Sequence, residues 1–260
     1  MMWIDTHCHL DAPEFAADRE AVIASAQRAG VSAFVIPAVT LDTCQDVLTL
    51  CQQQPACVPA LGLHPIYADS HHQLSDIDRL DELLARHRPR AVGEIGLDFF
   101  VEGLSEEKQT ALFVAQLKLA RKHDLPVLLH VRRSQDKILK YLRQFPVRGG
   151  FAHAFNGSRQ QAQQFLDMGF KLGFGGAMTY PRALRIRELA TTLPLDALVI
   201  ETDAPDIPPE WQPHQRHAPD QLPRIASLLA ELRGGIPLGE LATQLRRNSE
   251  AVLGPLPAGI

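Results

Sequence analysis

The 260-residue chain contains only four cysteines, and no two of them have the CxxC spacing. This excludes a disulfide framework or a cysteine-rich zinc site as the basis of the fold, and reduced, mostly buried thiols are expected. The chain also lacks an apolar run of the roughly 18 residues that a membrane span requires. Its first residues do not form a basic segment followed by a long apolar core, so no secretory signal is indicated. We therefore expect a cytoplasmic protein without membrane contact.

Basic residues are not in excess. The chain has 26 lysines and arginines against 30 aspartates and glutamates, and its formal net charge is −4. Proteins that wrap nucleic acid electrostatically usually carry a basic excess, so any nucleic-acid contact is expected to be local and centred on a site. A GxGxxG motif after the first strand is also missing, which argues against a nucleotide-binding open sheet.

Short apolar runs alternate with amphipathic stretches from one end of the chain to the other. Most of the runs are near-continuously apolar, which is typical of parallel strands covered on both faces. The predicted strands are Trp3–His7, Ala33–Pro37, Val58–Leu63, Ala91–Ile95, Pro126–Val131, Gly150–Ala154, Lys171–Phe174 and Leu198–Thr202.

Helices are expected between these strands. The clearest follows an N-cap at Ser105, and another covers residues 238–253 before Gly254 and Pro255. Eight βα units predict the α/β class and a (β/α)₈ barrel, which typically needs about 250 residues. No linker or repeat divides the chain, so residues 1–260 are expected to form one barrel domain. The segment Ala204–Pro223 is predicted to be one long loop after the last strand, and such loops are often functional.

Six side chains of metal-ligand type follow or end the predicted strands, where barrel enzymes build their active sites. They are His7, His9, Glu94, His130, His153 and Asp203. The period of two along a strand puts the first two histidines on one face and Cys8 on the other.

The other four side chains have expected roles in binding metal or in catalysis. Glu94 carries two oxygens and can bridge two cations about 3.5–4 Å apart. His130 and His153 are expected to supply nitrogens to the second ion. Asp203 is expected to be a ligand of the first ion and also the base that takes a proton from the attacking water. Glu94 and Asp203 are thus the expected catalytic residues, whereas Glu201 is expected to tie the barrel to a helix.

The motifs in this order resemble the TatD family of metal-dependent deoxyribonucleases, and they span residues 5 to 205. The matching pieces are Asp5-Thr-His-Cys-His-Leu10, Gly62-Leu-His-Pro65, Gly93-Glu-Ile-Gly-Leu-Asp98, Leu125-Pro-Val-Leu-Leu-His130, His153-Ala-Phe-Asn-Gly157 and Glu201-Thr-Asp-Ala-Pro205. The resemblance implies the same six metal ligands, with His64 and Arg132 as phosphate contacts.

The sequence departs from the family after Asp203. Arg216 is expected to replace a loop arginine of the family and to contact substrate. Asp206 stands where the family often has an aromatic residue, so a base-stacking partner is expected to be missing there. The histidines without strand-end placement are assigned to the surface or to loops. They are His71, His72, His87, His123, His214 and His217.

The favoured function is hydrolysis of phosphodiester bonds at DNA 3′ ends or in short oligonucleotides, through a water activated by two divalent cations. The ligand set is compatible with Zn²⁺, Mg²⁺ or Mn²⁺. DNA or an oligonucleotide is the expected partner, and no protein partner is predicted. The alternative is a small-molecule hydrolase, such as an amidase, lactonase or esterase, that uses the same metal site. Positive groups lining the mouth would favour the first function over the second.

Overall fold

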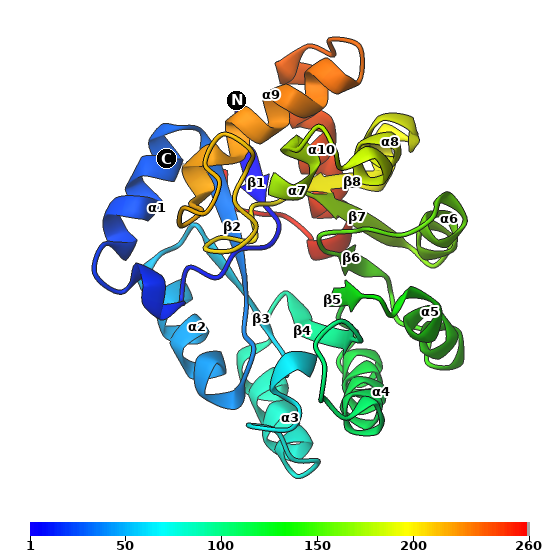
Figure 1. Ribbon diagram of the computed structural model, residues 1–260. Helices are drawn as coiled ribbons and strands as arrows, with labels where there is room; N and C mark the ends of the chain where they lie inside the picture. The colour runs from blue at the N-terminus through cyan, green and yellow to red at the C-terminus, as the bar shows by residue number, and fades with distance from the viewer. Residues whose placement is uncertain (259–260) are drawn as a thin grey trace.

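The computed structural model describes residues 1–258 of the chain, and in this part eight parallel strands pair in sequence order to form one sheet that curves into a barrel (Figure 1). The strands are β1 (Trp3–Asp5), β2 (Val31–Pro37), β3 (Cys57–Leu61), β4 (Ala91–Asp98), β5 (Val127–Arg132), β6 (Gly150–Ala152), β7 (Phe170–Phe174) and β8 (Leu198–Ile200). The predicted (β/α)₈ barrel is therefore confirmed.

Helices surround the strands on the outside of the barrel (Figure 1). They are α1 (Arg19–Arg28), α2 (Leu41–Gln53), α3 (Asp76–His87), α4 (Glu106–Lys122), α5 (Gln135–Gln144), α6 (Arg159–Asp167), α7 (Gly176–Thr179), α8 (Leu184–Thr192), α9 (Leu222–Leu232) and α10 (Leu238–Leu253), with 3₁₀ turns η1 (Pro13–Phe15), η2 (Pro65–Tyr67), η3 (Leu195–Ala197) and η4 (Pro219–Gln221). The described residues contain no helix that is both long and apolar enough to cross a membrane.

Local sequence explains where the best-defined helices begin and end. The Ser105 hydroxyl accepts the N–H of Lys108, so it caps α4 as predicted. Gly254 ends α10 with a φ of 76°, a left-handed conformation that glycine adopts without steric cost. The predicted loop 204–223 is wrong at its end because α9 begins at Leu222. Pro219 and Pro223 lie in the first turns of η4 and α9, where the missing N–H of proline costs no helical hydrogen bond.

Alternate residues of the strands face two separate apolar layers. Outward side chains such as Phe34 and Ile36 pack against the helices, whereas inward ones such as Val35 join an inner core. The inner core contains Ile4, Ala33, Val35, Val58, Ala60, Ala91, Leu128, Phe151, Val199, Val252, Leu253 and Leu256. Most of these strand residues lie near the start of their strand, and the last three come from α10 and the segment after it. The inner core therefore fills the end of the barrel at which the strands begin and leaves the carboxyl end for polar side chains.

Backbone hydrogen bonds join β1 and β8 just beyond their carboxyl ends. The Thr6 N–H donates to the Ile200 carbonyl at 3.1 Å, and the Asp203 N–H donates to the His7 carbonyl at 2.8 Å. The His9 N–H then donates to the Ala204 carbonyl at 2.7 Å. We call this set of bonds the seam. It brings residues that follow the first strand into direct contact with residues that follow the last strand.

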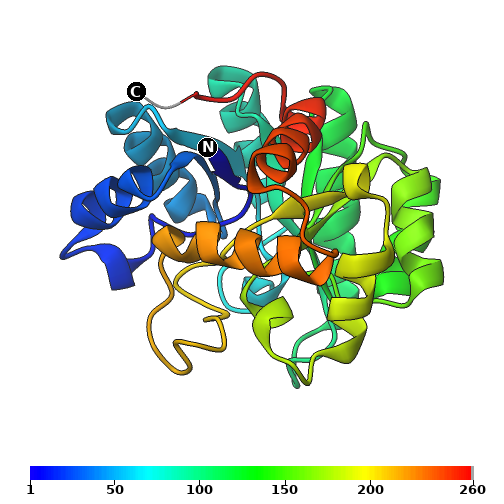
Figure 2. The ribbon, with the colours of Figure 1, turned by 90° about the horizontal axis from the view of Figure 1, so that it is seen from above.

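A buried carboxyl group strengthens the seam. Asp5 accepts the Thr202 N–H at 3.0 Å and the Thr202 hydroxyl at 2.6 Å. Burial raises the pKa of Asp5 to about 7, although the hydrogen bonds from Thr202 oppose the rise. Figure 2 shows the gold loop after β8 projecting from the opposite side of the barrel to the start of β1.

Candidate active site

Glu94 is the centre of the polar cluster. It lies within β4 rather than at its end, and its side chain is buried. Val92, Ile95 and Leu97 belong to the outward layer, and the pairing of β4 with β5 shifts register between Val92 and Ile95. Such irregularities re-aim a side chain next to many active sites. Here the shift turns Glu94 toward the barrel axis, although strict alternation from Val92 would point it outward.

One oxygen of Glu94 faces the first group of candidate ligands. Its Oε2 lies 3.2 Å from His7 Nε2 and 3.6 Å from His9 Nε2. The same two nitrogens each lie 3.6 Å from Asp203 Oδ1. Four donor atoms on a tetrahedron with metal–ligand bonds near 2.1 Å would be separated by about 3.4 Å. The separations between these nitrogens and oxygens are close to that value. His7, His9 and Glu94 form one compact group of candidate ligands, and His7, His153 and Asp203 form another.

The second oxygen of Glu94 faces a second group of nitrogens. Its Oε1 lies 3.0 Å from His130 Nδ1, 3.1 Å from His153 Nε2 and 3.2 Å from His64 Nε2. His130 Nδ1 and His153 Nε2 are 3.4 Å apart. The two oxygens of one carboxylate thus face two different sets of histidines, which is the arrangement that a bridging ligand requires.

His130 and His64 differ in the hydrogen bonds that their rings make on the side away from Glu94, and these bonds give the two rings different chemical roles. His130 Nε2 lies 2.9 Å from Asp98 Oδ2, and when the neutral ring donates this hydrogen bond, its Nδ1 carries the lone pair that faces the cluster. His64 is the reverse case, because its Nδ1 accepts the Ile66 N–H at 3.1 Å. In neutral His64 the proton is then on Nε2, the atom that faces Glu94. His130 is suited to bind a metal, and His64 is suited to donate a hydrogen bond.

Charge within the cluster favours cations. Burial raises the pKa of Glu94 and Asp203, but the surrounding histidines outweigh it and hold the Asp203 pKa at about 2 and the Glu94 pKa well below its ordinary value. Burial lowers the pKa of His9, yet Asp203 and Glu94 raise it to about 9. Burial lowers the pKa of His64 to about 4, so this ring is neutral at physiological pH. Protonated imidazoles such as that of His9 thus balance the two ionised, buried carboxylates, and a divalent cation that replaced those protons would balance the same carboxylates.

The backbone at Asp203 also departs from an ordinary strand. Its φ is 60°, a left-handed value that is uncommon for a residue with a side chain. The seam bond from its N–H to His7 and the bond from the Asp206 N–H to its carbonyl at 2.8 Å hold it there. Strain of this kind gathers at functional sites where the surroundings enforce it.

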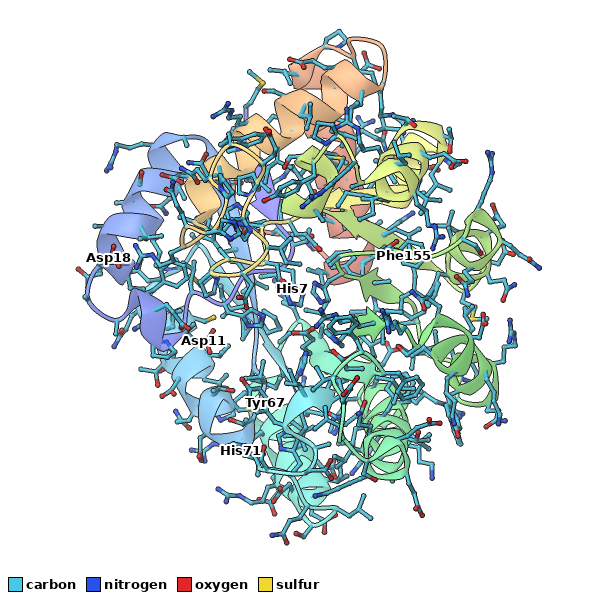
Figure 3. All side chains as sticks on the ribbon, in the orientation of Figure 1. His7, Asp11, Asp18, Tyr67, His71 and Phe155 are labelled. Carbon is cyan, nitrogen blue, oxygen red and sulfur yellow. The ribbon has the colours of Figure 1, made fainter. Side chains whose placement is uncertain are left out.

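The arginines expected at the mouth have different places. Arg132 ends β5, and its Nη1 lies 3.9 Å from Asp98 Oδ2, so it adjoins the carboxylate that holds His130. Arg216 instead forms an ion pair with Asp18 at 2.6 Å and donates to the Glu14 carbonyl. In Figure 3, Asp18 lies at the periphery beside α1, whereas His7 lies in the middle of the ring of strands. The structure therefore brings Arg132, but not Arg216, to the cluster.

One minor prediction is wrong, and two others hold only in part. Glu201 does not tie the barrel to a helix: it has the same strand parity as the inward Val199, and its Oε1 lies 3.6 Å from His153 Nδ1. Gly173 leaves the room for it, because a Cβ there would lie 2.1 Å from Glu201 Oε2. His72 and His217 lie in loops, as predicted, but their side chains are buried. His72 contacts the His64 carbonyl and His217 contacts the Asp206 carbonyl, so both support loops beside the site.

Two glutamines of α4 support the site, and the sequence analysis missed both. The Gln109 side chain accepts the Asp98 N–H at 2.8 Å and donates to the Asp98 carbonyl at 3.0 Å. Gln116 makes the same pair of bonds with Leu63, at 2.7 and 3.1 Å, directly before His64. Their spacing of seven residues puts them on one buried face of the helix. Two glutamines among the apolar residues of this helix face are the sequence feature that could have revealed their role.

Replacing Gln116 by leucine is expected to destabilise the fold by about 2–6 kcal/mol, because two buried backbone groups of Leu63 would lose their partners at about 1–3 kcal/mol each. Chemical denaturation followed by circular dichroism measures this loss. The matched control is Gln45→Leu on the exposed face of α2, where the change should stay within about 0.5 kcal/mol. Equal stability of the two variants would show that the Gln116 bonds do not support the end of β3.

The barrel and its histidine–carboxylate cluster at the carboxyl ends of the strands define the class of metal-dependent hydrolases with a (β/α)₈ fold. The model of the TatD-related DNase family matches residues 4–254. The chain belongs to this family, as its motifs predicted.

Individual relatives agree with this assignment. The chain is 42% identical over 250 residues to the uncharacterized metal-dependent hydrolase YjjV of Escherichia coli K12, covering 95% of this chain and 96% of that one. It is 33% identical over 237 residues to the 3′-5′ ssDNA/RNA exonuclease TatD of Shigella flexneri serotype 5b, covering 88% and 91%. The crystal structure of E. coli YjjV superposes with a TM-score of 0.93 and 41% identity, covering 97% and 98%.

Proposed function

We propose that this chain is a phosphodiesterase that removes nucleotides from the 3′ ends of single-stranded DNA. The observation that carries the proposal is the guanidinium of Arg132 beside Asp98, which adds a positive group to a cluster in which Glu94 faces two sets of nitrogens. The similarity to the Shigella flexneri exonuclease supports the same substrate class. The proposed metal ligands are His7, His9, Glu94, His130, His153 and Asp203.

Two divalent cations bound by these ligands would supply Lewis-acid stabilisation of phosphoryl charge and make water at the site more acidic. Nitrogen-rich ligands favour Zn²⁺ or a similar ion, and the carboxylates also accept Mg²⁺ or Mn²⁺. The chain itself would provide three functions. Asp203, ionised at neutral pH, accepts the proton of the attacking water. The neutral His64 donates its Nε2–H to a phosphate oxygen, and Arg132 binds the phosphate charge.

A direct assay tests this function. Metal-reconstituted protein is incubated with 5′-labelled single-stranded DNA, with RNA and with a panel of neutral aryl esters and amides. We expect a ladder of products shortened from the 3′ end of the DNA. Turnover of the neutral substrates without any shortening of DNA or RNA would reject the nuclease and favour the small-molecule hydrolase.

Replacing Arg132 by alanine is expected to lower kcat/KM for the phosphodiester by roughly 10- to 150-fold, the equivalent of one hydrogen bond to a charged group at about 1.5–3 kcal/mol. Neutral esters should keep their rate because they lack the charge that Arg132 meets. The slope of log affinity against log salt should become shallower by about 0.7.

Arg148→Ala is the matched control, since Arg148 precedes β6 at the opposite end of the barrel and bonds the Asp124 carbonyl. It should leave both substrate types unchanged. An equal loss on phosphodiesters and neutral esters in Arg132→Ala would contradict the phosphate role of this residue.

A further inference from the structure

Phe100 is an exposed aromatic side chain next to the cluster. It follows β4 by two residues and is 45% exposed. The other large apolar side chains that are exposed in the described part of the chain are not aromatic. They are Met1, Met2, Leu74 and Leu184. Phe100 alone among them closely follows a strand at the end of the barrel that carries the polar cluster.

Two guanidinium groups contact the Phe100 ring. The Cζ atom of Arg132 lies 3.9 Å from the ring centroid, and that of Arg133 lies 4.7 Å from it. Arg132 is the last residue of β5, and Arg133 follows it with a φ of 54°, a left-handed value that is uncommon for a residue with a side chain. Two cations are thus gathered around one ring in a chain whose formal net charge is −4.

The backbone that carries Phe100 is fixed to the cluster. Asp98 Oδ1 accepts the Phe100 N–H at 2.8 Å and the Val101 N–H at 3.0 Å. The other oxygen of this carboxylate accepts the Nε2–H of His130 at 2.9 Å. The Phe99 N–H also donates to the Arg132 carbonyl at 2.9 Å. One carboxylate therefore positions both a candidate metal ligand and the aromatic ring.

We infer that Phe100, with Arg132 and Arg133, binds an unpaired nucleobase of a single-stranded nucleic acid, on the nucleotide next to the scissile phosphodiester. The inference rests on the proposed phosphodiesterase function and extends it by a base-binding subsite. Aromatic rings and guanidinium planes stack with every base, whereas a duplex keeps the faces of its bases covered. The subsite therefore favours single strands and tolerates any base sequence.

Fluorescence of 2-aminopurine tests the subsite. Phosphorothioate-linked single-stranded tetranucleotides carry this base at one position at a time, and stacking on a protein aromatic ring quenches its emission. Binding to metal-loaded wild-type protein should quench one position most strongly. The Phe100→Leu variant should lose this quenching and bind the tetranucleotide roughly 5- to 150-fold more weakly, the range of one base–aromatic stack. Phe100→Trp, which restores a ring, should restore both.

Two controls separate stacking from a structural role. A tetranucleotide that is abasic at the quenched position should bind equally well to wild-type protein and to Phe100→Leu. Phe145→Leu, which changes the ring beside Lys118 at the end of α5, should behave as wild type. Equal weakening of the abasic and ordinary tetranucleotides by Phe100→Leu, or no weakening of either, would overturn the subsite.

The proposed function is judged separately, by whether the wild-type protein cleaves the ordinary phosphodiester tetranucleotide. Quenching that depends on Phe100 without such cleavage would support the subsite and reject the phosphodiesterase. Equal cleavage by the wild type and by Phe100→Leu, without quenching that depends on Phe100, would support the phosphodiesterase and reject the subsite.

Discussion

Replacing Glu94 by glutamine is expected to remove at least one bound metal ion and nearly all hydrolytic activity. The two oxygens of Glu94 face separate sets of nitrogens, at 3.2 Å from His7 on one side and 3.0 Å from His130 on the other. An amide carries one oxygen and an NH₂ group, so one set would face a hydrogen-bond donor in place of an anionic oxygen. Changes that only support a ligand cost 10- to 100-fold in metal affinity, so the loss here should exceed about 100-fold.

Elemental analysis of wild type and variant, together with turnover under metal saturation, measures both effects. We expect up to two divalent ions per wild-type chain. Glu107→Gln, at the exposed start of α4, is the control and should keep metal and activity. A Glu94→Gln protein that retains both ions and full turnover would rule out the bridging role.

The second large effect is expected for Asp203→Asn. Asparagine preserves the shape and one donor oxygen but cannot accept a proton. Loss of a positioned general base costs about 10²–10⁴-fold in rate, so kcat should fall by this amount in metal-saturated protein. Because asparagine keeps one oxygen ligand, metal content should fall less than kcat.

Metal content and kcat are measured on the same preparation, so that a loss of ions is not mistaken for a loss of the base. Asp196→Asn in η3, at the opposite end of β8, is the matched control. An unchanged kcat in metal-saturated Asp203→Asn would show that another group accepts the proton.

The fold was predictable because each strand is marked by a short apolar run, and these runs recur along the whole chain. Each apolar strand is buried on both faces in a barrel, so runs such as the one before His130 marked their strands directly. The six candidate ligands were found because parallel strands gather their carboxyl ends at one place. The exact ends of the strands differed, and Glu94 lies inside β4 rather than at its end. Strand boundaries depend on hydrogen bonds to neighbouring strands, which local sequence does not specify.

What the sequence could not predict depends on contacts between distant segments. The register shift that turns Glu94 inward arises from the pairing of β4 with β5. The ion pair that holds Arg216 at Asp18 joins residues 198 positions apart, and a single sequence contains no trace of it. Glu201 is different, because alternation from Val199 already places it on the inner face.

The seam has a consequence for how the protein is made. Its bonds join His7 to Asp203 and His9 to Ala204, so one set of candidate ligands is assembled from the first and the last strand of the barrel. Contacts of such long sequence separation form slowly, and the ribosome releases the first histidines long before the last strand. A nascent chain that lacks β8 therefore cannot complete the site and should be unable to hydrolyse any substrate. Hydrolytic activity is therefore expected only when synthesis has passed Asp203 and the barrel has closed.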